Sequence, residues 1–192
     1  MSIKRRIILP ALMISLLLSG CGGAGNAERK VEQQRDAFAA AETVSFRARC
    51  TAYPGGDEVF VCELSCSADA EQTAVVVDAP ATVAGISAVA RSGETVLSYD
   101  GVQLVVGSAA HTLGPIPAMP LLAETLCRGH VLRAWEERQE ETQLIAADFF
   151  CEAENTEITV WFEESAMQPM YAELRCGGAT ALKCEILNFT CT

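Results

Sequence analysis

The sequence predicts an α+β protein built around a curved antiparallel sheet of about eleven strands. Short segments of alternating apolar and polar residues recur between residues 44 and 189, separated by turn sequences. Two helical segments interrupt this series, one before the first strand and a shorter one in mid-chain. Because strands twist, a single sheet of this width cannot stay flat and must curl or close.

The chain begins with the pattern of an export signal. Lys4, Arg5 and Arg6 precede an apolar run over residues 7–18, which contains Pro10. The run is too short to cross a bilayer as a mature helix, and proline would interrupt such a helix. We therefore predict a secretory signal peptide.

The residues that end this signal, Leu18-Ser19-Gly20-Cys21, resemble a bacterial lipobox. The resemblance implies diacylglyceryl transfer to Cys21, acyl chains such as palmitate, and cleavage just before it. The predicted division is a signal at 1–20, a tether at 21–26 and one domain at 27–192. The exported protein would be anchored to the outer face of the cytoplasmic membrane, or to an envelope membrane in a host with two. An ordinary signal peptide that happens to contain a cysteine is the alternative.

The acidic composition argues against nucleic acid as a partner. The whole chain carries a net charge of −11, and the signal contains three of the 14 basic residues and none of the 25 acidic ones. The mature chain therefore has 11 basic against 25 acidic residues, a charge of −14. Such a chain repels phosphate backbones, so no nucleic-acid partner is expected. An acidic chain offers no basic patch for anionic lipids, so membrane attachment must come from the lipid on Cys21. Each buried methylene contributes ~0.8 kcal/mol, and stable anchoring needs two or more acyl chains.

The cysteines suggest disulfides. If Cys21 is acylated, eight of the nine cysteines remain, and an even number in an exported chain favours pairing. Metal binding is the rival interpretation, but there is no C-x-x-C motif and the chain has two histidines. No metal site and no cofactor are expected. The eight cysteines are Cys50, Cys62, Cys66, Cys127, Cys151, Cys176, Cys184 and Cys191.

The first element of the domain is a helix from Asn26 to Thr43. Asn26 is a suitable N-cap, and Val31, Phe38 and Ala41 lie near one stripe of the helix. Because the other positions are charged or alanine, the helix should dock through a narrow face.

The clearest hairpin signal joins residues 44–52 to residues 60–68. Both segments alternate strictly, and Tyr53-Pro54-Gly55-Gly56-Asp57 between them is a turn sequence. Folding the chain about Gly56 places one apolar face on one side of the pair. The predicted partners are Ala52 and Phe60, Cys50 and Cys62, Ala48 and Leu64, and Phe46 and Cys66. Cys50 and Cys62 could form a disulfide if they occupy a non-hydrogen-bonded site.

Further strands follow at short spacing. Ser92-Gly93 and Asp100-Gly101 have the composition of two-residue hairpin turns. Gly107 to Pro120 is expected to form a long loop, and Leu121 to Cys127 a short apolar helix that acts as a lid or as a permanent plug. The predicted strands are 73–78, 86–91, 95–99, 102–106, 131–138, 143–150, 157–162, 170–176 and 182–189.

The last hairpin is predicted to turn at residues 177–180. That turn would place Cys176 opposite Cys184 as a second candidate disulfide, and Leu174 opposite Ile186. Four cysteines remain unassigned: Cys66, Cys127, Cys151 and Cys191.

A family resemblance rests on the order of these elements and on three stretches. These are residues 91–101, RSGETVLSYDG; Thr159-Val160-Trp161-Phe162 with Gln168-Pro169-Met170-Tyr171-Ala172-Glu173; and Ile186-Leu187-Asn188-Phe189. They resemble the LolA/LolB/LppX-like proteins. Among lipobox-bearing members, the chain looks most like clostridial-type lipoproteins, including spore germination lipoproteins. The resemblance implies an unclosed half-barrel of about eleven strands, helices over its concave face and an apolar cavity for acyl chains.

No enzyme is predicted. The sequence has no G-x-S-x-G, S-x-x-K, H-E-x-x-H, P-loop or dinucleotide motif, and its paired acids lie at predicted strand ends. Two functions remain: a half-barrel that binds a lipid or another apolar ligand, and an interaction module that holds or activates an envelope enzyme. The first rests on apolar residues of the concave face, which could instead form a filled core. The candidate ligand-binding residues are Val44, Phe46, Ala48, Leu64, Val75, Val77, Ile158, Val160 and Phe162.

Overall fold

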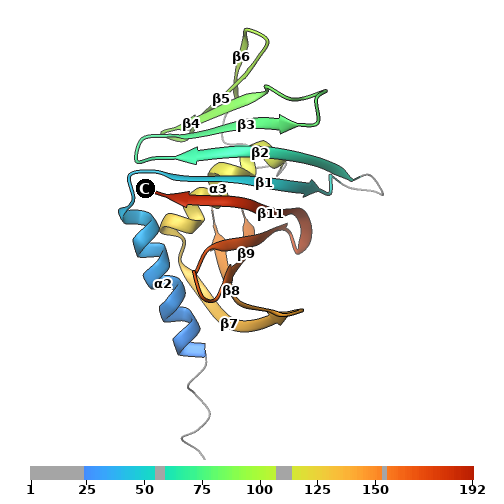
Figure 1. Ribbon diagram of the computed structural model, residues 1–192. Coiled ribbons are helices and arrows are strands. Elements are labelled where there is room, and N and C mark those ends of the chain that lie inside the picture. Colours follow the sequence, from blue (N-terminus) through green and yellow to red (C-terminus); the bar gives the residue numbers. More distant parts are fainter. Residues whose placement is uncertain (1–23, 55–58, 107–113, 153–154) are drawn as a thin grey trace, which may run out of the picture.

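The computed structural model describes residues 24–54, 59–106, 114–152 and 155–192 (Figure 1). These residues form one antiparallel sheet of eleven strands in the order β6-β5-β4-β3-β2-β1-β11-β10-β9-β8-β7. The edge strands β6 and β7 lie at opposite ends of this order, so the sheet is an open half-barrel, as predicted. The strands are β1 Val44–Ala52, β2 Phe60–Ala68, β3 Thr73–Ala79, β4 Ser87–Arg91, β5 Glu94–Tyr99, β6 Val102–Val106, β7 Val131–Gln139, β8 Thr142–Cys151, β9 Thr156–Glu163, β10 Pro169–Cys176 and β11 Ala179–Cys191.

Two helices lie on one face of this sheet. The helix α3, Pro115–Arg128, crosses behind β2, β1 and β11 in Figure 1, and it contacts β1, β2 and β3. The helix α2, Ala24–Ala40, packs against β7, β8 and α3. The predicted signal peptide and Cys21 lie outside the described residues. No helix in the described part of the chain has the length and apolar character to span a bilayer.

The predicted β1–β2 hairpin is confirmed residue for residue. Phe46 pairs with Cys66, Ala48 with Leu64, and Cys50 with Cys62. The even-numbered residues of β1 are all buried, and the odd-numbered ones are partly or fully exposed. The predicted alternation therefore follows from one face of the hairpin covering the core.

The two predicted hairpin turns have the expected backbone. At Asp100 and Gly101 the φ angles are 48° and 80°, and at Ser92 and Gly93 they are 52° and 81°. Positive φ at both central residues is the mark of the type I′ turn, whose twist matches that of the strands it joins.

The N-terminal helix is shifted relative to the prediction. It begins at Ala24, so Asn26 lies inside the helix, and residues 24–26 are not part of a tether. Ala27 and Val31, four residues apart, are both buried, so the first two turns of the helix are docked on the core. The helix ends before Thr43 because the N–H groups of residues 42 and 43 donate to the carbonyl oxygen of Thr192, at 2.7 and 3.0 Å.

The mid-chain helix is twice as long as predicted, because the prolines that suggested a loop lie within it. Pro115 is at the start, where the N–H group of a helix has no internal partner, so proline loses no hydrogen bond there. Pro120 lies inside the helix and removes one hydrogen bond from it. Burial of one face of α3 in the half-barrel outweighs this loss.

The predicted register of the last hairpin is wrong. The turn consists of Gly177 and Gly178, with φ angles of 58° and 82°, and Cys176 pairs with Ala179. An irregularity between Leu174 and Arg175 then shifts the register, so that Leu174 pairs with Leu182 rather than with Ile186. Two glycines allow the tighter two-residue turn because they adopt positive φ without steric cost.

Candidate ligand-binding site

A cavity of about 810 Å³ opens between α3, the C-terminal end of α2 and the neighbouring ends of β1 to β5. Its walls come from five segments: the end of α2, the β2–β3 turn, the β4–β5 hairpin, the start of β1 and the partly exposed side of α3. The apolar lining includes Phe38, Val44, Ala90, Leu97, Ile116 and Leu121.

The mouth of the cavity carries both signs of charge. Arg91 pairs with Glu71 at 2.6 Å, and Glu124 and Arg128 on α3 complete the charged rim with Asp69. The pKa of Asp69 is lowered because the N–H groups of Glu71 and Gln72 donate to its carboxylate, at 2.8 and 2.9 Å. These bonds fold the β2–β3 turn tightly, and the turn sets one wall of the mouth.

Most of the predicted ligand-binding residues lie elsewhere. Val44 lines the cavity, whereas Phe46, Ala48, Leu64, Val75, Val77, Ile158, Val160 and Phe162 belong to the packed core. Met119, Leu122 and Leu126 of α3 are buried in that same core. The helix thus fills the middle of the concave face, and the open space lies beside it.

Sequence reasoning missed the residues that α3 and the turns contribute. Ile116, Pro117 and Pro120 were expected in a loop, so their place on a cavity wall could not be inferred. Thr95 and Leu97 lie in the predicted strand 95–99. Because successive side chains of a strand point to opposite faces, the charged Glu94 just before it could have identified Thr95 and Leu97 as facing inward.

The cysteines are distributed over several strands, and three of them, Cys62, Cys50 and Cys184, are neighbours across β2, β1 and β11. Cys50 and Cys62 are partners across β1 and β2, so their predicted proximity is confirmed, and a disulfide between them stays a prediction. Cys176 and Cys184 are not partners: Cys184 pairs with Ala172, so the geometry assumed for that disulfide is wrong. Of the four unassigned cysteines, Cys66 is buried, Cys127 and Cys151 are half-buried, and Cys191 is exposed. Among the described residues, no three or more His, Cys, Asp or Glu side chains are arranged to hold a metal ion.

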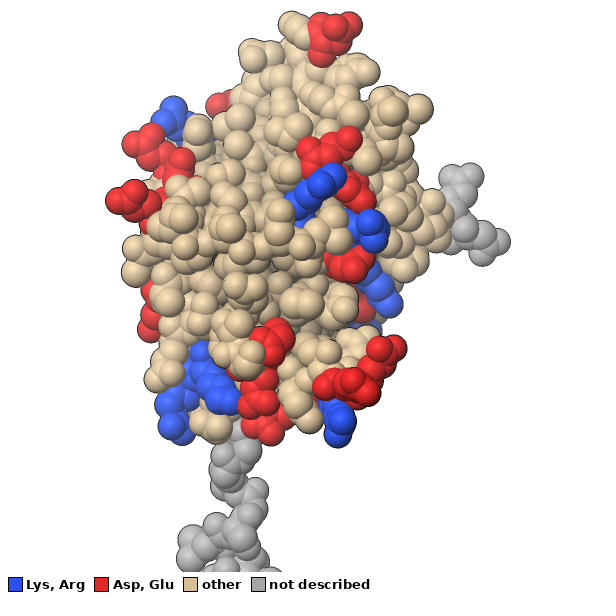
Figure 2. Space-filling view, viewed as in Figure 1, with Lys and Arg blue, Asp and Glu red and all other residues tan. Residues whose placement is uncertain are grey.

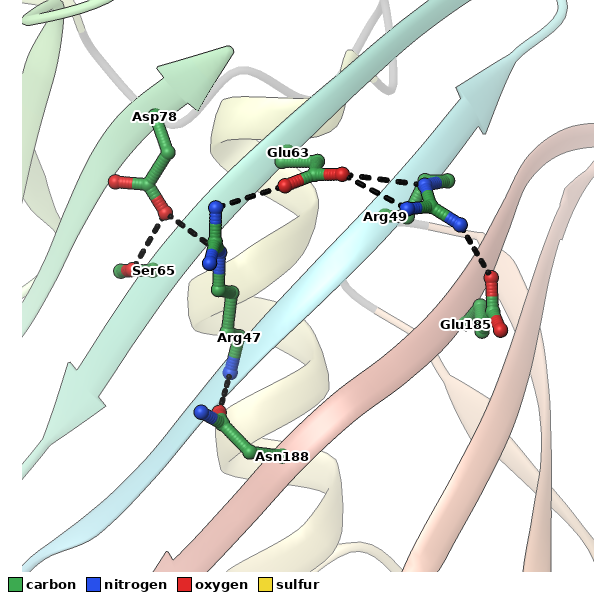
Figure 3. A network of polar contacts seen from close by, with 7 residues as sticks. All are labelled: Arg47, Arg49, Glu63, Ser65, Asp78, Glu185 and Asn188. Atoms are coloured by element: carbon green, nitrogen blue, oxygen red, sulfur yellow. Dashed lines mark hydrogen bonds and ion pairs between the residues drawn. The ribbon is translucent and has the colours of Figure 1, made fainter.

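The opposite, convex face of the sheet carries a network of ion pairs (Figure 3). The guanidinium group of Arg47 lies 2.8 Å from Glu63 and 3.2 Å from Asp78, and that of Arg49 joins Glu63 at 3.0 Å and Glu185 at 3.2 Å. Each charge has a partner of the opposite sign, so the network connects β11, β1, β2 and β3 and leaves no unpaired arginine to attract an anion. Away from it, Figure 2 shows few charged side chains at the upper end of this face, where β4, β5 and β6 lie.

Comparison with known proteins identifies the fold. No family model and no curated protein match the chain. A DUF1329 family protein from Desulfovibrio piger has a TM-score of 0.54 and 10% identity, over 86% of this chain and 92% of its own. A structure described as an outer membrane lipoprotein-sorting protein domain, from Vibrio parahaemolyticus, has a TM-score of 0.51 and 10% identity, over 86% of this chain and 93% of its own.

A third structure has lower similarity to this chain. A LolA superfamily protein from Nitrosomonas europaea has a TM-score of 0.47 and 9% identity, and it covers 88% of this chain and 94% of its own. At such identities the likeness concerns the fold. None of the structures named here is a spore germination lipoprotein, so the finer resemblance stays a prediction.

Proposed function

We propose that this protein is an exported lipoprotein, anchored through Cys21, that binds the acyl chain of a lipid or another apolar molecule in the cavity beside α3. The site of anchoring would be the outer face of the cytoplasmic membrane, or an envelope membrane where the host has two. Catalysis, a metal and a cofactor have no part in this proposal.

The cavity carries the proposal. Its volume of about 810 Å³ lies within the range of about 300–1,000 Å³ that small-molecule sites occupy. The lining includes the apolar side chains of Phe38, Leu97 and Leu121, and the charged residues that line the cavity are all exposed to solvent. This division fits a ligand with an apolar chain and a polar end, because the chain is removed from water while the polar end remains hydrated.

Extraction of bound lipid is the direct test. Protein made without residues 1–21, which lacks the anchor, is purified, extracted with organic solvent and analysed by mass spectrometry. A lipid recovered in stoichiometric amount supports the proposal. Its absence, together with no binding of the neutral apolar dye N-phenyl-1-naphthylamine, contradicts it.

Two substitutions in β4 locate the site. Ala90 lines the cavity, and its neighbour Val89 is exposed on the other face of the same strand. Ala90→Trp should fill the space that the ligand needs and weaken dye binding at least tenfold, a free-energy loss of about 1.4 kcal/mol. Val89→Trp adds the same ring at the adjacent position and should leave binding unchanged. Equal effects would place the dye outside the cavity.

An interaction module remains the second candidate function, one that holds or activates an envelope enzyme of the cell-wall or spore-germination kind. It is favoured by the edge strand β6, whose Val102, Leu104 and Val105 are 69%, 59% and 59% exposed. Exposed apolar side chains on an unpaired strand edge are a common docking surface for another chain. Failure of both the lipid extraction and the dye test would favour this candidate.

A further inference from the structure

Three buried cysteines lie in one row across the middle of the sheet. Cys50 on β1 pairs with Cys62 on β2 at one side and with Cys184 on β11 at the other. All three side chains are on the concave face and are at most 3% exposed. Because Cys62 and Cys184 are two strands apart, Cys50 is the shared member, and it can bond to only one of them.

Strand hydrogen bonding distinguishes the two pairs. The N–H of Tyr53 donates to the carbonyl oxygen of Ala181 at 2.9 Å, and the register continues through Ala52 and Leu182 to Cys50 and Cys184. Hydrogen-bonded and non-hydrogen-bonded pairs alternate along an antiparallel ladder, so Cys50 and Cys184 form a non-hydrogen-bonded pair. In such pairs the side chains lie closer together.

The pair with Cys62 is of the other kind. A strand residue directs its N–H and C=O groups toward the same neighbouring strand, and those of Cys50 therefore point toward β2. Cys50 and Cys62 thus occupy a hydrogen-bonded site, where the Cα atoms are about 5.5 Å apart rather than about 4.5 Å and the side chains are less close. The condition attached to the predicted Cys50–Cys62 disulfide is not met by this geometry.

The sulfur atoms agree with this distinction. The Sγ atoms of Cys50 and Cys184 are 3.3 Å apart. In a disulfide they lie at about 2.0 Å, so a small rotation of the two side chains is sufficient. We infer that Cys50 and Cys184 form a disulfide in the exported protein and that Cys62 remains a thiol.

The oxidation proceeds by thiol–disulfide exchange. A small-molecule or protein disulfide accepts the two electrons: the thiolate of one cysteine attacks it and releases the first thiol, and the second cysteine then displaces the other. Two protons and two electrons leave the pair as one Sγ–Sγ bond forms. Because both sulfurs are buried in the folded chain, this exchange must take place before the core closes.

Once formed, the bond is protected from the third cysteine. Burial raises the pKa of the Cys62 thiol well above its ordinary value. Cys62 is therefore protonated at neutral pH, and a protonated thiol does not attack a disulfide. The bond joins residues that are 134 positions apart and fastens β1 to β11, where the two halves of the sheet meet.

Peptide mapping tests the pairing on the full chain. The protein is purified from the exported fraction in detergent without reductant, and free thiols are blocked with iodoacetamide in denaturant, which exposes the buried Cys62. Trypsin alone leaves Cys50, Cys62 and Cys66 in one peptide, so a glutamate-specific protease is added, which cuts after Glu58, Glu63 and Glu185. A peptide of Cys50 linked to Cys184, with Cys62 alkylated, supports the inference. Alkylated Cys50, or Cys50 linked to Cys62, overturns it.

A matched pair of variants provides a second measurement. The Tm is measured with and without a strong reductant for the parent, for Cys184→Ala and for Cys62→Ala, which remove the two neighbours of Cys50. Reduction should lower the parental Tm by about 5–10 °C. This shift should persist in Cys62→Ala and should shrink by most of its size in Cys184→Ala. The reverse result, or a parental Tm that does not respond to reductant, overturns the inference.

Discussion

The backbone N–H of Gly129 donates a hydrogen bond of 2.9 Å to the carbonyl oxygen of Thr125, and a Cβ at Gly129 would lie 2.5 Å from that same oxygen. The ring of Phe149 would be 2.8 Å from this Cβ. Real Cβ atoms do not approach a backbone oxygen so closely, so a side chain here requires the last turn of α3 and the Phe149 ring on β8 to shift.

Gly129→Ala should therefore lower the free energy of unfolding by about 1–3 kcal/mol, the usual cost of overpacking. Urea unfolding followed by circular dichroism measures the change. Gly25→Ala is the control, because a Cβ there meets nothing within 4 Å. Since alanine is the better helix former by about 0.5–1 kcal/mol, Gly25→Ala should be neutral or stabilising. Equal losses in the two variants would contradict the close packing at Gly129.

Ala48→Trp tests whether the concave face is filled. Ala48 is fully buried between Leu64 on β2 and Ile186 on β11. Overpacking there should cost about 1–3 kcal/mol, which corresponds to roughly 2–12 °C in Tm for a chain of this size. Val61→Trp, on the exposed face of β2, should leave the Tm within about 1 °C, because surface substitutions change stability little. An unchanged Tm for Ala48→Trp would show empty space behind β1.

Cys21→Ala tests the lipid anchor. If Cys21 receives the diacylglyceryl group, the variant should lose fatty-acid labelling and move from the membrane fraction to the soluble envelope fraction, or remain unprocessed. Metabolic labelling with a palmitate analogue, followed by fractionation, measures both properties. Cys191→Ala serves as the control, because Cys191 is an exposed cysteine far along the chain. A labelled Cys21→Ala protein would contradict the lipobox interpretation.

Glu163 should stabilise the folded protein at neutral pH and lose this contribution in acid. Hydrogen bonds from the hydroxyl and N–H of Ser165 and from the N–H of Ala166 lower the pKa of Glu163 below its ordinary value of 4.5. A lowered pKa in the folded state stabilises the protein above pH 4.5, and this contribution disappears as the pH falls through the folded pKa.

The difference in stability between the parent and Glu163→Gln should accordingly be largest near pH 6 and should vanish at strongly acid pH. Carbon-detected NMR titration of the Glu163 carboxyl group gives the folded pKa directly. A measured pKa of 4.5 or above would show that Ser165 and Ala166, in the turn between β9 and β10, do not hold the Glu163 carboxylate through these hydrogen bonds.

The parts of the fold that could be predicted are those in which neighbouring residues decide the outcome. Alternation in both β1 and β2 predicted their register, because a slip by one residue would move every apolar side chain to the solvent side. The Asp100-Gly101 turn was equally predictable, since positive φ at both positions favours these residue types.

The parts that could not be predicted depend on packing between distant segments. The prolines of α3 indicated a loop, and only burial of Met119 and Leu122 against the sheet makes a helix favourable there. The cavity follows from the position of α3, so the residues of its far wall carried no local signal. The row of Cys62, Cys50 and Cys184 likewise required the β1–β11 pairing, which joins opposite ends of the domain.

That pairing of β1 with β11 also constrains the order of events during synthesis. Strands β1 to β6 are joined by short connections in sequence order and can pair as they emerge, because loop closure between near neighbours costs little entropy. Strand β1, however, keeps one unsatisfied edge until β11, the strand synthesised last of the eleven, arrives beside it. A chain that stops before Ala179 therefore leaves the backbone N–H and C=O groups on one edge of β1 unpaired, and such edges recruit other chains. Secretion in an unfolded state would let β1 and β11 emerge within one folding event, and truncated products should be found in aggregates rather than as half-domains.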